Sequence, residues 1–257
     1  HTPPPPPTPP RHSTRRQRQM CIRDSLTAIL VGVAKTGVSG MAILVVPLIA
    51  MVFPAKESVG ALLPMLIAGD VLAVIYYRRH AQWRQLIKLM PGVATGMLIG
   101  GMFLAQLDNE SMRIFLGVFV LLLLMIEGIA RHLQLNEFKK LRSFAVLVGV
   151  MAGFGTTVGN SAGPIMGIYF IMMGFDKKQL MGSGAWFFLI VNTSKLPIVI
   201  YHEMIGADTL QFFAYMMPVV VIGTFLGRKL LTVLSKKIFD HLVLIFAGLS
   251  SLWLLLF

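Results

Sequence analysis

Apolar residues along the chain are gathered into eight long segments that short polar loops separate. The segments run over residues 26–53, 58–77, 91–107, 113–130, 143–174, 181–201, 212–227 and 240–257. Most are close to the roughly 20 residues with which a helix crosses the hydrocarbon core of a bilayer. The first and fifth are longer, and the whole pattern predicts an all-α, multi-pass membrane protein.

The fifth segment is interrupted at its centre by residues that do not suit a membrane helix. Its core, residues 147–174, is LVGVMAGFGTTVGNSAGPIMGIYFIMMG. The interruption consists of Thr156, Thr157, Gly159, Asn160, Ser161, Gly163 and Pro164. Backbone N–H and C=O groups that are freed at membrane depth are tolerated only where they line a cavity or are buried in protein. The interruption therefore predicts a binding site.

The first segment repeats this arrangement. Residues 30–47, LVGVAKTGVSGMAILVVP, begin with the same four letters as residues 147–164 and reach a proline after the same spacing. Two interrupted apolar segments at corresponding positions of two halves indicate the substrate site of a secondary transporter.

The charges of the loops indicate how the two long segments are threaded. If every segment crosses the membrane once, Lys and Arg are shared equally between the two sides. If the long segments return to the side from which they start, as re-entrant pairs or helix hairpins, one side receives fourteen basic residues and the other only Lys56 and Arg113. Basic residues in short loops mark the cytoplasm. We therefore expect the second topology, with the loops 131–142 and 228–237 in the cytoplasm.

Each half then contains a broken helix or hairpin and three transmembrane helices, which places the halves in opposite orientations. Residues 26–130 are the first repeat, 131–142 the linker and 143–257 the second repeat. Residues that match between the halves support a duplication: Met90-Pro91 with Met217-Pro218, Gly96 and Gly100 with Gly223 and Gly227, Asp70 with Asn192, and Gly60 with Gly182. We expect a helical bundle of two homologous, inverted halves.

The composition agrees with a membrane protein, but the first 25 residues do not belong to the pattern. Charged residues make up 13% of the 257, about half of the quarter that is usual in soluble domains. Residues 1–25 are Pro-rich and then Arg-rich, which predicts a disordered tail. Its end, RQRQMCIRDS, resembles a translated sequencing adapter, so we expect the tail to be non-native. A native basic tail that binds anionic lipid or nucleic acid is the alternative.

Several classes of protein are disfavoured by the motifs. Cys21 is the single cysteine, and no CxxC or HExxH spacing is present, so we expect no metal and no cofactor. No GxxxxGK[ST] motif is present, so transport would draw on a gradient or on facilitated flow. Gly182-Ser183-Gly184 could suggest a serine nucleophile, but no histidine lies at a comparable depth. We therefore expect no enzymatic activity.

Two lysines lie within apolar segments. Lys35 stands in the first interruption, and Lys195 lies in the sixth segment within NTSKLPI. A lysine at membrane depth costs roughly 2.5 to 3.5 kcal/mol on insertion scales, so such a residue is expected to be functional. We expect Lys35 and Lys195 to be alternative or joint contacts of an anion, and Lys35 could instead be the positive charge opposite Asp70. The alternatives are that Lys35 extends to the membrane surface and that Lys195 is a structural partner of Asp70.

Polar groups near the lysines supply candidate hydrogen-bond donors for an anion. They are Thr36, Thr156, Thr157, Asn160, Ser161 and Asn192. A half-helix that begins near Pro164 would add free N–H groups and the positive end of its dipole. For each hydroxyl, a bond back to its own helix is the alternative.

Asp70 is the one acidic residue well inside the first half. It could neutralise a lysine or carry a coupling proton. It would also be the lead ligand of an ion channel or of a cation or proton-coupled carrier, which is the alternative function. Two buried lysines against one buried aspartate favour an anion transporter.

Several stretches resemble the TauE/SafE sulfite exporter family, also called the TSUP family. They are VGVAKTGVSG, PAKESVGALLPMLIAGDVLAVIYYRRHAQW, GFGTTVGNSAGPIMGIYF and GSGAWFFLIVNTSKLPI, and the resemblance covers residues 26–257. It implies a secondary transporter of sulfite, a sulfonate or a related organosulfur or carboxylate anion. Thiosulfate importers of the family use intramembrane cysteines, which argues against thiosulfate here because Cys21 lies in the tail.

The resemblance also sets expectations for location and partners. We expect a multi-pass protein of the bacterial inner membrane whose partners are a small anion and the lipid bilayer, and no nucleic acid. A homodimer is an alternative to a monomer.

Overall fold

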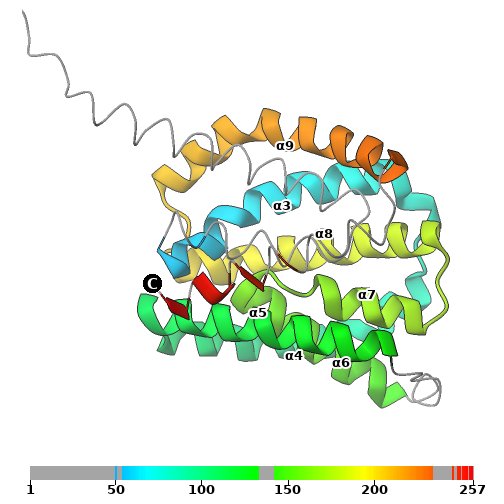
Figure 1. Cartoon of the computed structure of the whole chain (residues 1–257), viewed down its shortest axis with the longest axis horizontal. Helices are drawn as coiled ribbons and strands as arrows, with labels where there is room; N and C mark the ends of the chain where they lie inside the picture. Colours follow the sequence, from blue (N-terminus) through cyan, green and yellow to red (C-terminus); the bar gives the residue numbers. More distant parts are fainter. Residues whose placement is uncertain are drawn as a thin grey trace, which may run out of the picture.

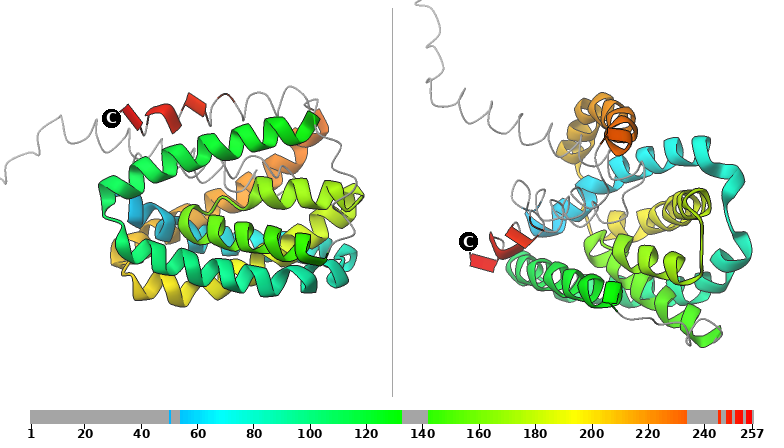
Figure 2. Two further views of the ribbon diagram at one scale, coloured as in Figure 1. Left: turned by 90° about the horizontal axis from the view of Figure 1, so that it is seen from below. Right: turned by 45° about the vertical axis from the view of Figure 1, so that its right-hand side comes forward.

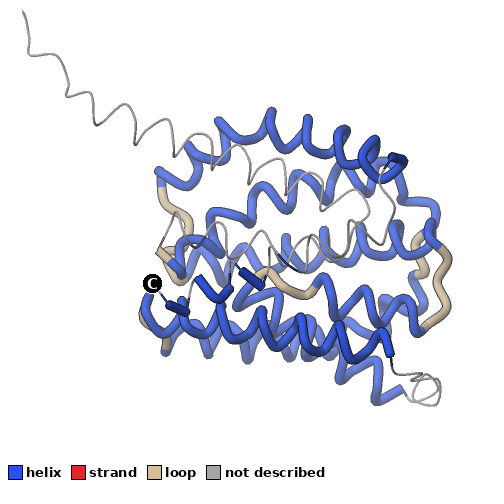
Figure 3. The backbone as a smooth tube through the Cα atoms, in the orientation of Figure 1, coloured by secondary structure: helices blue, strands red, loops and turns tan. Residues whose placement is uncertain are grey.

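The computed structural model describes residues 54–132 and 142–233, together with Ala50 and short pieces between residues 245 and 256. Within this part of the chain, every element of secondary structure is a helix (Figure 3). The all-α class predicted from the apolar segments is therefore confirmed.

The helices pack side by side as a bundle with their long axes roughly aligned (Figure 1). In chain order they are α3 (Ala55–Tyr77), η1 (Arg78–His80), α4 (Trp83–Gln106), α5 (Asn109–His132), α6 (Arg142–Gly159), α7 (Gly163–Met172), α8 (Lys177–Tyr201) and α9 (Ala207–Val233). Several helices extend beyond the apolar segments that predicted them, because polar residues continue the helix at its ends. The segment at 91–107, for example, is the greater part of α4.

Four of the described helices are long and apolar enough to cross a membrane. They are Ala55–His80, Trp83–Gln106, Asn109–Ile126 and Lys178–Tyr201. Shorter apolar helices occupy Ser143–Gly159, Gly163–Met172 and Thr209–Gly223. This set of spans supports a multi-pass membrane protein.

The fifth apolar segment folds as a hairpin. α6 runs into the bundle, and α7 runs back beside it to the end where α6 began (Figures 1 and 3). The ring centroids of Phe144 and Tyr169 lie 6.3 Å apart, and Gly155 faces Ile165 across the hairpin. The chain then turns through Gly174, whose φ is +73°, into a capping box between Asp176 and Gln179 that starts α8. The second long segment thus returns to the end it entered, which is the path that the loop charges favour.

Interlocked glycines bring α4 and α6 into close parallel contact. A Cβ atom on Gly96 would lie 2.1 Å from the Val150 carbonyl oxygen, and one on Gly153 would lie 2.2 Å from that of Val93. Gly92 and Gly149 approach the facing backbone in the same way. Small residues four apart let membrane helices pack backbone to backbone. This contact fixes α6, and with it the interrupted centre of the hairpin.

α3 and α8 lie antiparallel at the centre of the bundle (Figures 1 and 2). Gly60 near the start of α3 lies against the backbone of Met204, just after α8. Gly182 near the start of α8 lies against Tyr77 at the end of α3 and His80 of η1. The Ser183 hydroxyl there accepts a hydrogen bond of 2.9 Å from the Gln82 backbone N–H.

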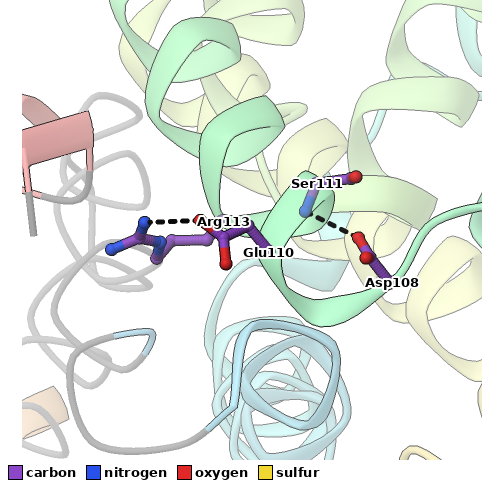
Figure 4. Close-up of polar contacts among 4 residues, drawn as sticks. All are labelled: Asp108, Glu110, Ser111 and Arg113. Carbon is purple, nitrogen blue, oxygen red and sulfur yellow. Dashed lines mark hydrogen bonds and ion pairs between the residues drawn. The ribbon is translucent and has the colours of Figure 1, made fainter.

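The loop before α5 is closed by short-range polar contacts (Figure 4). The Ser111 backbone N–H donates a 2.8 Å hydrogen bond to Asp108, and Arg113 pairs with Glu110 at 3.3 Å. Hydrogen bonds from Ser111 lower the pKa of the Asp108 carboxyl below its usual value. Asp108 therefore supports the start of α5 above the unfolded pKa, and this support is lost as the pH falls through the lowered, folded pKa.

Basic residues of the described chain gather at one end of the bundle. Around η1 and the starts of α4 and α8 stand Arg78, Arg79, Arg84, Lys88, Lys177 and Lys178. The opposite end, where the Lys56 N–H donates to the Asn109 side chain, has Lys56 and Arg113. This asymmetry predicts that the end with η1 faces the cytoplasm.

We predict opposite accessibility for the two ends. With Cys21 replaced by serine, His80→Cys should resist an impermeant thiol reagent in intact cells and react after permeabilisation. Ser111→Cys, at the start of α5, is exposed and should react in intact cells. Labelling of His80→Cys before permeabilisation would contradict the proposed orientation.

We also predict that the α4–α6 contact is sensitive to one added methyl group. Gly96→Ala should lower the thermal stability of the detergent-solubilised protein, because overpacking typically costs about 1 to 3 kcal/mol. Gly184→Ala is the matched control, since among the described residues its Cβ would meet only Phe170, at 3.8 Å. Equal melting temperatures for the two variants would show that the contact is not tight.

Candidate functional site

α6 ends in the interior of the bundle because Asn160 adopts a left-handed conformation, with φ of +51°. Asparagine tolerates this region better than most residues and commonly ends a helix in this way. The Asn160 N–H bonds to the Thr156 carbonyl at 3.0 Å, and the Ser161 N–H to that of Gly155 at 3.1 Å. Asn160 is 6% exposed. The polar end of a helix therefore lies buried in protein.

The ammonium group of Lys195 reaches this helix end from α8. Its Nζ donates to the Thr156 carbonyl at 2.8 Å, to the Thr156 hydroxyl at 3.3 Å and to the Asn160 side-chain oxygen. The side chain of Lys195 is completely buried. The C-terminus of a helix carries partial negative charge, so it stabilises a cation placed against it.

Asn160 also connects the helix end to α3. Its side-chain N–H donates a 3.0 Å hydrogen bond to the Val59 carbonyl oxygen. Pro64, further along α3, has no N–H, so the carbonyl of Gly60, next to Val59, lacks its helical donor. One asparagine thus joins α3, α6 and α8 around Lys195.

The other polar residues of the interruption make local bonds in this structure. The Thr157 hydroxyl donates to the Gly153 carbonyl at 2.8 Å, and the Ser161 hydroxyl to that of Gly159 at 2.6 Å. Both residues are fully buried beside Thr156 and Asn160. Their hydroxyl protons are engaged by their own segment, and their oxygens remain acceptors.

Asn192 and Asp70 meet one helical turn from Lys195. The Asn192 side-chain N–H donates a 2.7 Å hydrogen bond to the Asp70 carboxylate, and each residue is 1% exposed. The structure therefore places Asn192 on Asp70, while it places Lys195 on the end of α6.

α7 begins directly after the interruption, with Pro164 in its first turn and no side chain that caps its N-terminus. A helix start of this kind offers free N–H groups and partial positive charge. Because α6 ends and α7 starts within three residues, oppositely charged helix ends face the same buried place. Of the predicted site residues, Thr156, Thr157, Asn160, Ser161 and Lys195 are brought together here, whereas Lys35 and Thr36 lie outside the described residues.

The sequence pattern did not single out three buried polar groups. The Val59 carbonyl contacts the site through Asn160, and no pattern marks a backbone oxygen. The others are the Tyr169 hydroxyl and the Trp186 indole N–H, which are buried without a hydrogen-bond partner among the described residues. The sequence could have indicated these two groups by the presence of tyrosine and tryptophan within apolar helices, because the polar atoms of such residues usually find a partner when buried.

Comparison with known proteins identifies the family. No curated protein and no solved structure is significantly similar to the chain. The family model described as "Sulfite exporter TauE/SafE" matches residues 25–254, which includes every helix described above. The chain therefore belongs to the TauE/SafE sulfite exporter family of membrane transporters for sulfur-containing anions.

Proposed function

We propose that the protein is a secondary transporter of a small anion, namely sulfite, a sulfonate or a related organosulfur or carboxylate anion. The observation that carries this proposal is the buried ammonium of Lys195 at the interrupted centre of a membrane hairpin. A cation placed at such cost inside a membrane protein is expected to serve the substrate or its pathway.

Lys195 is placed where an anion can approach it. The Thr156 and Asn160 oxygens that it contacts are formally neutral. An entering anion would add a charge-to-charge attraction to these contacts. Hydrogen bonds to ionised groups are also about twice as strong as those between neutral groups.

The α7 N-terminus supplies the second part of the proposed site. Its free N–H groups lie at the same interruption as Lys195 and would bind the oxygens of a sulfite or sulfonate group. Thr157 and Ser161 would add donors if their hydroxyls turned away from their own segment. We propose Lys35 and Thr36 as the corresponding contacts from the first half.

The proposed mechanism is alternating access between two inverted halves. Inverted repeats bring their interrupted helices together near the middle of the membrane, and a rocking motion exposes that point to each side in turn. The antiparallel packing of α3 against α8 and the return of α7 support this arrangement. We place the protein in the bacterial inner membrane, with the basic end in the cytoplasm.

Asp70 supports the alternative of a channel or a cation or proton-coupled carrier. Its carboxylate is almost fully buried, and a buried acid is a common ligand for cations and protons in membranes. Lys195 distinguishes the two functions, because only an anion gains from its charge.

We predict that Lys195→Gln weakens binding of the anion. Loss of a charged hydrogen bond of roughly 1.5 to 3 kcal/mol would raise the KM for sulfite about ten- to a hundred-fold. Lys195→Arg should also be impaired, because a planar guanidinium does not replace a compact ammonium. The measurement is the uptake of labelled sulfite, sulfoacetate and acetate by proteoliposomes with and without a pH gradient.

Lys178→Gln is the matched control, because Lys178 lies on the same helix but is exposed. It should transport like the unmodified protein. Wild-type KM values for well-inserted Lys195→Gln and Lys35→Gln would contradict the anion site and favour the channel or cation function.

A further inference from the structure

Asp70 and Asn192 occupy matching positions of the two halves, and they contact each other. The two residues are separated by 122 positions, and Gly60 and Gly182 are separated by the same number. Their side chains share a 2.7 Å hydrogen bond in the buried centre of the α3–α8 pair. A position that contacts its own counterpart lies at a twofold axis, as in the symmetric interface of a dimer.

The contacts at the two ends of α3 and α8 obey the same rule. Gly60 lies against Met204, three residues after the end of α8. Its counterpart Gly182 lies against Tyr77, the last residue of α3, and against His80 and Ala81, which follow α3. Each glycine precedes its buried polar residue by ten positions, or about 15 Å of helix. Asp70 and Asn192 therefore stand midway between two equivalent contacts.

We propose that the Asp70–Asn192 pair lies on the pseudo-twofold axis that relates the two halves and is the fixed point about which they move. This inference rests on the proposed alternating-access function. Asp70 and Asn192 act as positioning residues and carry neither the anion nor a coupling proton.

The reason follows from how inverted repeats change state. The outward-open and inward-open forms are generated when the two halves exchange conformations. A contact between position i of the first half and position j of the second half is then replaced by a contact between position j of the first half and position i of the second half. Contacts at the ends, such as Gly60 with Met204, can loosen on one side and tighten on the other. The pair on the axis maps onto itself, so its hydrogen bond persists in both forms.

The chemistry of the pair suits a persistent contact. Two aspartates on the axis would repel each other, whereas asparagine donates to a carboxylate in a strong, charge-assisted hydrogen bond. With both residues 1% exposed, breaking that bond in each cycle would be costly. A rocking motion is easiest if this bond is left intact.

Because the two positions are equivalent by symmetry, the residues should be exchangeable. The test is the double variant Asp70→Asn/Asn192→Asp, which keeps the buried net charge and the hydrogen-bonding groups. We expect its sulfite transport rate to lie within about twofold to threefold of that of the unmodified protein. Its melting temperature should lie within a few degrees. Asn192→Asp alone, which places two carboxylates together, should lower the maximal rate more than tenfold and leave the KM of any residual transport unchanged within about twofold.

The control exchange is Asn160→Lys/Lys195→Asn, a buried hydrogen-bonded pair whose two positions are not equivalent. It should lose transport, which shows that exchange is not tolerated everywhere. A folded double variant of the axis pair that is inactive, or has a changed KM, would overturn the proposal by assigning Asp70 to substrate or proton transfer.

If the exchanged protein does not fold, Asp70→Asn alone decides, because two asparagines can still share a hydrogen bond across the axis. Folding with transport supports the axis pair, and loss of either overturns it. Melting temperatures measured without added sulfite do not depend on whether the protein transports it. If the unmodified protein failed to move sulfite, the proposed function would be wrong. The pair could still be tested, because adding Asp70→Asn to Asn192→Asp should restore the melting temperature that Asn192→Asp lowers.

Discussion

The arrangement of the site depends on one constraint, which is that the buried ammonium of Lys195 needs protein oxygens around it. The C-terminus of a helix suits this, because its last carbonyl groups carry partial negative charge and can be reached by the side chain of a neighbouring helix. The left-handed Asn160 creates that end inside the bundle and adds its own side-chain oxygen. A helix end at this depth requires the chain to turn back, and Gly163 and Pro164 begin the returning helix. The hairpin, the interruption and the buried lysine therefore depend on one another.

The glycines of α4 and α6 help to hold the end of α6 in place, although they do not contact Lys195. A helix that stops inside a membrane protein lacks a full crossing with which to hold its position. The backbone contacts of Gly96 and Gly153 fix α6 against the complete span of α4. The end of α6 is thereby placed beside α8, where small shifts would matter for the three hydrogen bonds from Lys195. The apolar framework is rigid close to the site, as a preorganised binding site requires.

Most of the fold could be predicted because hydrophobic length and loop charge act locally. The interruption at 156–164, the depth of Lys195 and the return of the fifth segment all follow from residues close together in the sequence. The partners could not be predicted in this way. Asn160 was one of several equivalent candidates until the structure placed it on Lys195 and Val59, while Thr157 and Ser161 bond within their own segment. Asn192 was expected near an anion, but its partner Asp70 is 122 residues away.

The proposed symmetry is a property of the framework, and the charges depart from it. At the spacing that relates Asp70 to Asn192, the counterpart of Lys195 is Ala73, a small buried residue of α3. The described cation therefore belongs to the second half alone, and an anion held by Lys195 would travel with the end of α6 when the halves rock. To the buried polar contacts of the bundle, the first half would contribute the Val59 carbonyl, which fixes Asn160, and the carboxylate of Asp70, which binds Asn192. A symmetric framework can move both halves equally, while the charges placed on it decide where between the halves the anion is held.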